Sequence, residues 1–114
     1  MDALVMNRFS MSKIENGVRL TGKTDPLMLN PQGVASSGAL MTLMANAGFE
    51  AFRVQKRLET VLDSFTVYFT KPVQLEQDIE VEAIIIDMGR KSGKAEINIV
   101  HEGNLVAKSI ISVR

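Results

Sequence analysis

The chain contains no cysteine and only one histidine, His101, among its 114 residues. Without cysteine there are no disulfides, no thiolate nucleophile and no cysteine-ligated zinc or iron–sulfur centre. A single histidine excludes a multi-histidine metal site, and a Ser-His-Asp triad is feasible only if His101 is its base. We therefore expect neither a metal ion nor a cofactor.

The sequence also lacks an excess of charge of either sign, because thirteen basic side chains balance thirteen acidic ones. Proteins that bind nucleic acids usually carry a basic excess, so no nucleic-acid partner is expected. No apolar run approaches the ~18 residues of a membrane span, and residues 1–8 lack the pattern of a signal peptide. With 46% hydrophobic residues, we expect one folded domain over residues 1–114, located in the cytoplasm.

The first part of the chain is predicted to form a β-hairpin. Asn16-Gly17 is a strong signal for a two-residue turn. Apolar and polar side chains alternate from Val18 to Thr24, as in a half-buried strand. We place the hairpin at residues 3–24. The prolines in Asp25-Pro26 and Asn30-Pro31-Gln32-Gly33 disfavour helix before them and predict an irregular loop.

A single helix follows this loop. Ser36 and Ser37 are good N-cap residues, and apolar residues recur at three- and four-residue spacing over 39–54. Residues 39–49 are apolar on nearly every side, so this part of the helix is expected to be surrounded by other elements. Cations follow Glu50, which predicts that the end of the helix emerges into solvent, where they also suit the helix dipole.

The rest of the chain is predicted to form strands, at residues 65–70, 79–86, 95–101 and 105–113, because apolar and polar positions alternate there between glycine- and proline-containing turns. We expect these four strands to form an antiparallel meander. So few strands can enclose a helix only by curling. The predicted class is therefore α+β with a hotdog fold, a curled antiparallel sheet wrapped around one long central helix. A helix-packed α+β sandwich is the alternative.

Several segments, in this order, resemble the acyl-CoA thioesterases of the hotdog superfamily. They are Asn30-Pro31-Gln32-Gly33, Ser37-Gly38-Ala39-Leu40, Leu43–Ala47, Phe65–Val73, Gly89-Arg90 and Gly103–Lys108. The resemblance extends from about Asn30 to Val113. It is nearest to the hotdog domains appended to bacterial regulatory proteins that carry CBS modules.

The resemblance implies an acyl-CoA site at the start of the helix. Gly38 would supply the backbone oxyanion donor, and Asn30, Gly33 and Ser37 would contact the substrate. Physically, a helix N-terminus offers free N–H groups and a positive dipole end, which stabilise the oxyanion of a thioester under attack. Coenzyme A would enter as part of the substrate. The alternative interpretation of both glycines is a tight turn and close packing of helix on sheet.

The sequence departs from the family's pattern at the expected acid. Serines replace the motif histidine, and the acidic residue expected on the helix falls on Ala45 or Asn46, depending on a one-residue shift. Neither side chain can act as a general base. Glu50, one turn beyond Asn46, could take over the acid's role; otherwise it is a solvated carboxylate. Asn46 could bind a water or the thioester oxygen, or it is simply a buried polar residue.

Three basic residues, Arg90, Lys91 and Lys94, cluster around a glycine-flanked turn. Arginine and lysine suit the phosphates of coenzyme A, although an ordinary solvated turn would look the same. His101 has no readable serine–acid partners, so we expect a surface or dimer contact there.

The leading hypothesis is a thioesterase that binds acyl-CoA and hydrolyses its thioester, using Gly38, Asn46 and Glu50. A curled sheet leaves an unpaired edge strand, so we expect a homodimer or a dimer of dimers, with the ligand sites at the interface. The alternative is a non-catalytic acyl-CoA-sensing or dimerisation module of a regulatory protein.

Overall fold

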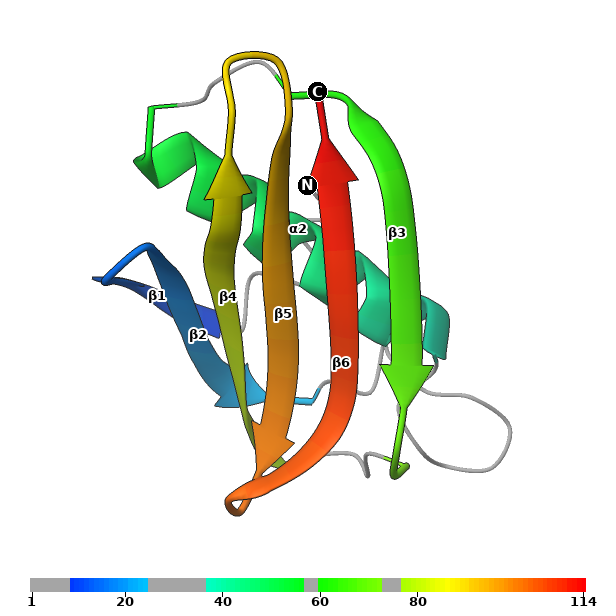
Figure 1. Cartoon of the computed structure of the whole chain (residues 1–114). Helices are drawn as coiled ribbons and strands as arrows, with labels where there is room; N and C mark the ends of the chain where they lie inside the picture. Colours follow the sequence, from blue (N-terminus) through cyan, green and yellow to red (C-terminus); the bar gives the residue numbers. More distant parts are fainter. Residues whose placement is uncertain (1–8, 25–36, 57–59, 73–76) are drawn as a thin grey trace.

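The computed structural model describes residues 9–24, 37–56, 60–72 and 77–114, which contain six strands and one long helix (Figure 1). Their order is β1 (Phe9–Ile14), β2 (Gly17–Lys23), α2 (Ser37–Val54), β3 (Leu62–Phe69), β4 (Asp78–Met88), β5 (Gly93–His101) and β6 (Asn104–Val113). The predicted contacts Asn30 and Gly33, and residues 3–8 of the predicted hairpin, lie outside the described residues.

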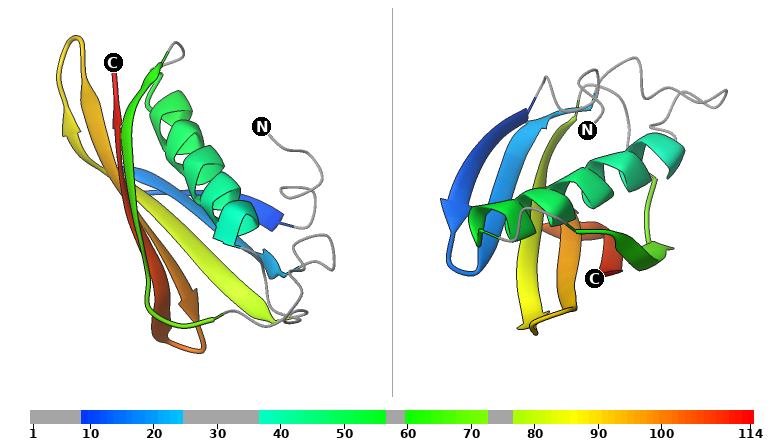
Figure 2. Two further views of the ribbon diagram at one scale, coloured as in Figure 1. Left: turned by 90° about the vertical axis from the view of Figure 1, so that its right-hand side faces the viewer. Right: turned by 90° about the horizontal axis from the view of Figure 1, so that it is seen from above.

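The strands form one antiparallel sheet in the order β1-β2-β4-β5-β6-β3, which curls around one side of α2 (Figure 2). This arrangement confirms the α+β hotdog fold. The predicted four-strand meander is wrong in one respect, because β3 pairs with β6 at the far edge of the sheet. Both edges of β4 are already taken, by β2 and β5, so no place beside β4 is left for β3.

The first hairpin has its turn one residue earlier than the Asn-Gly signal predicts. Glu15 and Asn16 form the turn, and Asn16 adopts a left-handed φ of 63° that asparagine tolerates. Gly17 is already the first residue of β2. A Cβ atom at Gly17 would clash with the carbonyl oxygen of Ala83 on β4. The glycine is therefore needed where β2 meets β4, rather than in the turn.

The helix turns one regular apolar stripe towards the sheet. The stripe consists of buried residues at three- and four-residue spacing: Leu40, Leu43, Met44, Ala47, Gly48, Ala51 and Phe52. Apolar side chains of the inner sheet face pack against it to form a single core. The other side of α2, which begins with Gly38 and Met41, is partly exposed. Within one chain the sheet therefore covers only one side of this helix.

The edge strand β3 is covered less completely than its neighbour. Its inner-face residues Phe65 and Val67 are half-buried and Phe69 is 43% exposed. Their cross-strand partners on β6 are fully buried. The helix lies mainly over β2, β4 and β5, so it leaves an apolar strip along β3 partly open.

Candidate functional site

The helix begins at Ser37, as the serine pair predicts, and its first turn contains no acidic side chain. The positive end of the helix dipole therefore has no carboxylate of its own within that turn. Gly38, in the same turn, is exposed, and a Cβ atom built there would meet nothing within 4 Å. Its backbone is not left-handed either. Among the described residues, neither crowding nor a left-handed backbone requires a glycine at position 38.

The predicted catalytic residues lie along two different lines of side chains on the helix surface, and each such line is called a row below. With about 100° per residue, Ala45 lies about 20° from Gly38 around the helix axis, and Met41 falls in the same row. Asn46 lies about 80° from Gly38 on the opposite flank and shares its row with Glu50. One chain therefore does not bring Gly38 together with Asn46 and Glu50. Of the two candidate positions for the missing acid, Ala45 is the one aligned with Gly38.

Glu50 is held in an ion pair on the helix surface. Arg53 donates to Glu50 Oε2 from both Nη2, at 2.7 Å, and Nε, at 2.8 Å. The hydrogen bond with Glu50, together with its negative charge, raises the pKa of Arg53 above its usual value. The Glu50 side chain is only 13% exposed. It is thus a largely covered carboxylate with one oxygen occupied, rather than the solvated group considered from sequence.

Asn46 carries a buried polar atom that lacks a partner. Its Nδ2 is covered and makes no hydrogen bond within the part of the chain that the structure describes. Leaving a buried donor unsatisfied costs about 1–3 kcal/mol. An acceptor from a ligand or from a second copy of the chain would remove this cost.

The basic residues lie at the other end of the helix. Arg90 and Lys91 stand in the four-residue turn between β4 and β5, and Lys94 follows on β5 opposite Asp87. All three cations are exposed, and none of them takes part in an ion pair with the described residues. The three cations therefore lie in this turn and at the start of the strand that follows it.

The basic turn is anchored to the C-terminal end of α2. A Cβ atom at Gly93 would lie 2.6 Å from Cε1 of the buried Phe52, so β5 touches the helix there. Gly38 and Phe52 are fourteen residues apart, which is about 21 Å along a helix. Figure 1 shows the turn beside the end of the helix and its start at the opposite end. The oxyanion candidate and the phosphate candidates are therefore far apart within one chain.

An open pocket of about 400 Å³ lies at the end of the sheet opposite the basic turn. It is lined by Thr21, Gly22, Asp78, Ile79, Glu80, Val100, Glu102 and Gly103. Three of these residues are carboxylates, one of which, Glu80, is paired with Arg19 at 2.7 Å, and the lining contains no cation for the phosphates of coenzyme A. The sequence could not predict this pocket, because strand register brings its residues together from four segments.

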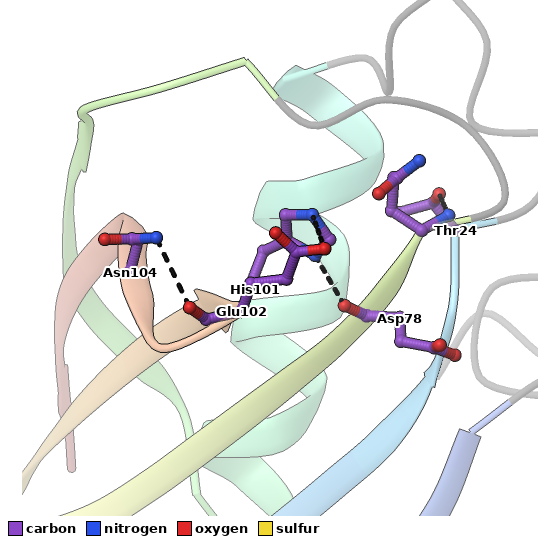
Figure 3. A network of polar contacts seen from close by, with 6 residues as sticks. Thr24, Asp78, His101, Glu102 and Asn104 are labelled. Carbon is purple, nitrogen blue, oxygen red and sulfur yellow. Dashed lines mark hydrogen bonds and ion pairs between the residues drawn. The ribbon is translucent and has the colours of Figure 1, made fainter.

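The histidine forms a polar link between the β5–β6 turn and β4 (Figure 3). The carbonyl oxygen of Asp78 can only accept a hydrogen bond, so His101 Nδ1, 2.8 Å away, must carry the proton. Its Nε2 lies 3.8 Å from Glu102 Oε1. Asn104 Nδ2 donates to the Glu102 carbonyl oxygen at 3.3 Å. No serine belongs to this network in the described residues. The contacts of His101 join the end of β5 to β4 and indicate a structural role.

In the described ranges, no three histidine, aspartate or glutamate side chains are grouped so that they could hold a metal ion. The one long helix there is also not apolar enough over its length to cross a membrane.

The sequence matches a known family over most of its length. Residues 32–108 match the Thioesterase superfamily, and the chain belongs to that family. It is also similar to the uncharacterized protein YtoI of Bacillus subtilis, with 39% identity over 89 residues that cover 78% of this chain. The match covers 20% of YtoI, so the chain spans about a fifth of that protein's length.

Solved structures share the fold at lower identity. Zebrafish thioesterase superfamily member 2 superposes with a TM-score of 0.90 at 18% identity, over 98% of this chain and 84% of that one. A hypothetical thioesterase of Streptococcus pneumoniae, solved with coenzyme A, superposes with a TM-score of 0.83 at 21% identity, over 92% and 86%. Both are hotdog neighbours of this chain.

Proposed function

We propose that this domain binds acyl-CoA at the N-terminus of α2 and acts as a thioesterase that hydrolyses the thioester with water. The observation that carries the proposal is the exposed Gly38 at the start of the helix, where an added Cβ atom would meet no atom of the described residues within 4 Å. Membership of the thioesterase superfamily supports it. So does the fold shared with a hypothetical thioesterase that was solved with coenzyme A.

The chemistry follows from the start of the helix. The backbone N–H of Gly38 would donate to the thioester carbonyl, and it would bind more strongly to the oxyanion that forms when water attacks. Gly38 leaves room for the carbonyl to approach the backbone. The Asn46 amide would donate to a water or to the thioester oxygen, but it cannot take up the proton of that water. Glu50 is the carboxylate that would have to accept it.

A dimer would bring the separated parts of the site together. The long edge strand β3, with its partly open apolar row, is better suited to pair with a second copy than the shorter β1, where Ser10, Ser12 and Lys13 are exposed. Two copies of β3 joined around a twofold axis run antiparallel. The partner's basic turn then comes to the end of the molecule where α2 begins. Arg90, Lys91 and Lys94 of one copy would hold the phosphates of a thioester bound at Gly38 of the other.

We expect the assembly to be a homodimer or a dimer of dimers, and light scattering tests it. Val67→Asp places a charge in the half-covered row of β3 and should yield monomers that lose acyl-CoA binding. Ser12→Asp on β1 is the matched control and should leave the mass unchanged. A monomeric unmodified protein at micromolar concentration would contradict both the dimer and the shared site.

One observation favours a second candidate function, a non-catalytic acyl-CoA sensor. The helix row that begins at Gly38 continues with Met41 and Ala45, so it carries no carboxylate. Such a site could hold a thioester without activating water. A module of this kind would suit a longer regulatory protein, and this chain matches only a fifth of YtoI. In either case a cytoplasmic location fits a ligand that contains coenzyme A and a chain without cysteine.

Two measurements on the full chain separate the candidates. Steady-state assays with acyl-CoA of several chain lengths test hydrolysis, and calorimetry with the same compounds tests binding. Turnover that falls in Glu50→Gln supports the thioesterase. Binding without turnover for every chain length identifies the sensor. If neither binding nor turnover is detected, the proposal as a whole is wrong.

A further inference from the structure

Ser109 on β6 is a fully buried serine whose hydroxyl has no hydrogen-bond partner among the described residues. Buried and half-buried positions alternate along this part of β6, so Ser109 lies on the inner face of the sheet, as Ala107 and Ile111 do. Native proteins contain few buried polar groups without a partner, because desolvating such a group is unfavourable. Packing alone would therefore favour an alanine at this position.

The flank of α2 that carries Gly38 is turned towards this part of the sheet. A Cβ atom at Gly48 would lie 3.1 Å from Ile111 Cγ2 and 3.3 Å from Ile97 Cδ1, so the helix passes over β5 and β6 there. Ile97 is the direct cross-strand partner of Ser109. At about 100° per residue, Gly38 lies about 80° from Gly48 around the helix axis, on the side away from the buried stripe. The row of Gly38 therefore faces β6 and the edge strand beyond it.

The edge strand β3 places a partly open apolar surface beside Ser109. Val67 is the partner of Ser109 on β3, and it belongs to the apolar strip described above, together with Phe65 and Phe69. The N-terminal end of α2 stands away from β3 (Figure 2). An apolar chain that starts at Gly38 and follows this strip therefore passes beside Ser109.

A ligand can reach the hydroxyl of Ser109 only if a covering side chain moves, since this residue is 0% exposed. Met41 is suited to such a movement. It lies about 20° from Gly48 around the helix axis, on the flank that faces β6, and it is 37% exposed. Methionine is unbranched and flexible, so it adapts to ligands of different shape.

We propose that Ser109 is a specificity-determining residue for acyl groups that carry a hydroxyl far along the chain. A serine hydroxyl both donates and accepts hydrogen bonds, so a hydroxyl of the acyl chain would supply the partner that Ser109 lacks. Gly48 is ten residues beyond Gly38, about 15 Å along a helix, so a substituent next to the thioester would not reach Ser109. This inference rests on the proposed acyl-CoA function and adds the kind of acyl group that the site prefers.

Calorimetry with non-hydrolysable thioether analogues of acyl-CoA tests the inference. The analogues are used in pairs of equal chain length, and one member of each pair carries a hydroxyl on its last carbon. For the chain length that reaches Ser109, the hydroxylated analogue should bind about 10-fold more tightly, because the unsubstituted chain leaves the serine without a partner. Shorter pairs should show no such preference.

Variants of β6 assign the preference to one hydroxyl. Ser109→Ala should abolish the preference and preserve the binding of the unsubstituted analogues. It should also raise the midpoint of thermal unfolding, because it removes a buried hydroxyl without a partner. Ser109→Cys has a similar size but hydrogen-bonds only weakly, so it should lose the preference as well. Ser112→Ala, on the outer face of the same strand, is the matched control and should keep it.

Three results would overturn the inference: equal affinity within every pair, a preference that survives in both Ser109 variants, or an equal loss of preference in Ser112→Ala. A lower unfolding midpoint for Ser109→Ala would also overturn it, because the hydroxyl would then already be bonded within the protein. In all these cases binding of the unsubstituted analogues would leave the proposed function intact. If no analogue of any chain length binds, the proposed function itself is refuted.

Discussion

The two sides of α2 differ in how far their side chains are buried and in how polar they are. The side facing the sheet is a continuous apolar stripe, and its residues are almost completely buried. The other side begins with an exposed glycine and contains the Glu50–Arg53 ion pair and Asn46, whose Nδ2 has no hydrogen-bond partner among the described residues. Packing alone accounts for the first side but not for the second. Changes on the two sides should therefore affect different properties, stability on one and ligand chemistry on the other.

The largest effect should come from the buried stripe. Leu43 is fully buried, and Leu43→Ala should lower the free energy of unfolding by about 2–5 kcal/mol, through lost burial and the cavity left behind. Met41 is 37% exposed on the other side, so Met41→Ala should cost less than about 1 kcal/mol. Urea unfolding of both variants measures the contrast. Equal losses would mean that the two sides do not differ in this way.

The next largest effect concerns Ala45 and Asn46, which are neighbours in sequence but lie on different rows of the helix. Ala45→Asp places a carboxylate in the row of Gly38 and should raise kcat for acyl-CoA hydrolysis by about 100-fold, a typical gain from a positioned base. Asn46→Asp puts the same group on the other flank and removes the amide donor proposed for the water or the thioester oxygen, so it should not raise kcat. Steady-state kinetics compare them. If Asn46→Asp were the more active variant, the assignment of rows would be wrong.

Replacing Gly38 by alanine should raise the stability of the protein and lower its acyl-CoA binding and turnover. Because a Cβ atom there meets nothing within 4 Å, Gly38→Ala should raise the free energy of unfolding by up to about 1 kcal/mol, the usual advantage of alanine over glycine in a helix. The same methyl group should weaken acyl-CoA binding and turnover. Urea unfolding and calorimetry on one preparation test both. A variant that loses stability would restore the packing interpretation of this glycine.

The smallest effect is expected at the Glu50–Arg53 pair. Glu50 raises the pKa of Arg53, and a raised pKa adds stability that is present at low pH and lost only as pH rises through the folded-state pKa. Arginine titrates far above neutrality, so loss of the Arg53 charge should have no effect on stability between pH 5 and 9. Arg53→Met should lower the midpoint of thermal unfolding slightly, and less at high salt. A change as large as that of Leu43→Ala would contradict a surface role.

Much of the fold was predictable because it depends on local patterns. The serine pair and the three- and four-residue spacing located the helix, and alternation located the strands. The position of β3 was not predictable, because alternation shows that a strand exists but does not name its partner. The true role of Gly17 was also hidden, since its need arises from Ala83, 66 residues away in sequence.

The candidate site was predictable only in part, and for a related reason. The motif at the start of the helix and the basic turn were both readable as short segments. Ala45 can be assigned to the row of Gly38 only once Gly38 is known to belong to the helix, and the apolar pattern predicted the helix only from residue 39. The acidic pocket had no signal at all, because its carboxylates are brought together by strand register.

The sequence alone determined the class of fold, the long helix, the absence of cysteine chemistry and the lack of an acidic residue at positions 45 and 46. These properties follow from composition and from the spacing of side chains along one element. Only the tertiary structure decided that β3 closes the far edge, that Gly38 is open and that the basic turn lies at the opposite end of α2 from it. Such facts depend on contacts between distant segments, which arise only when the chain closes its core.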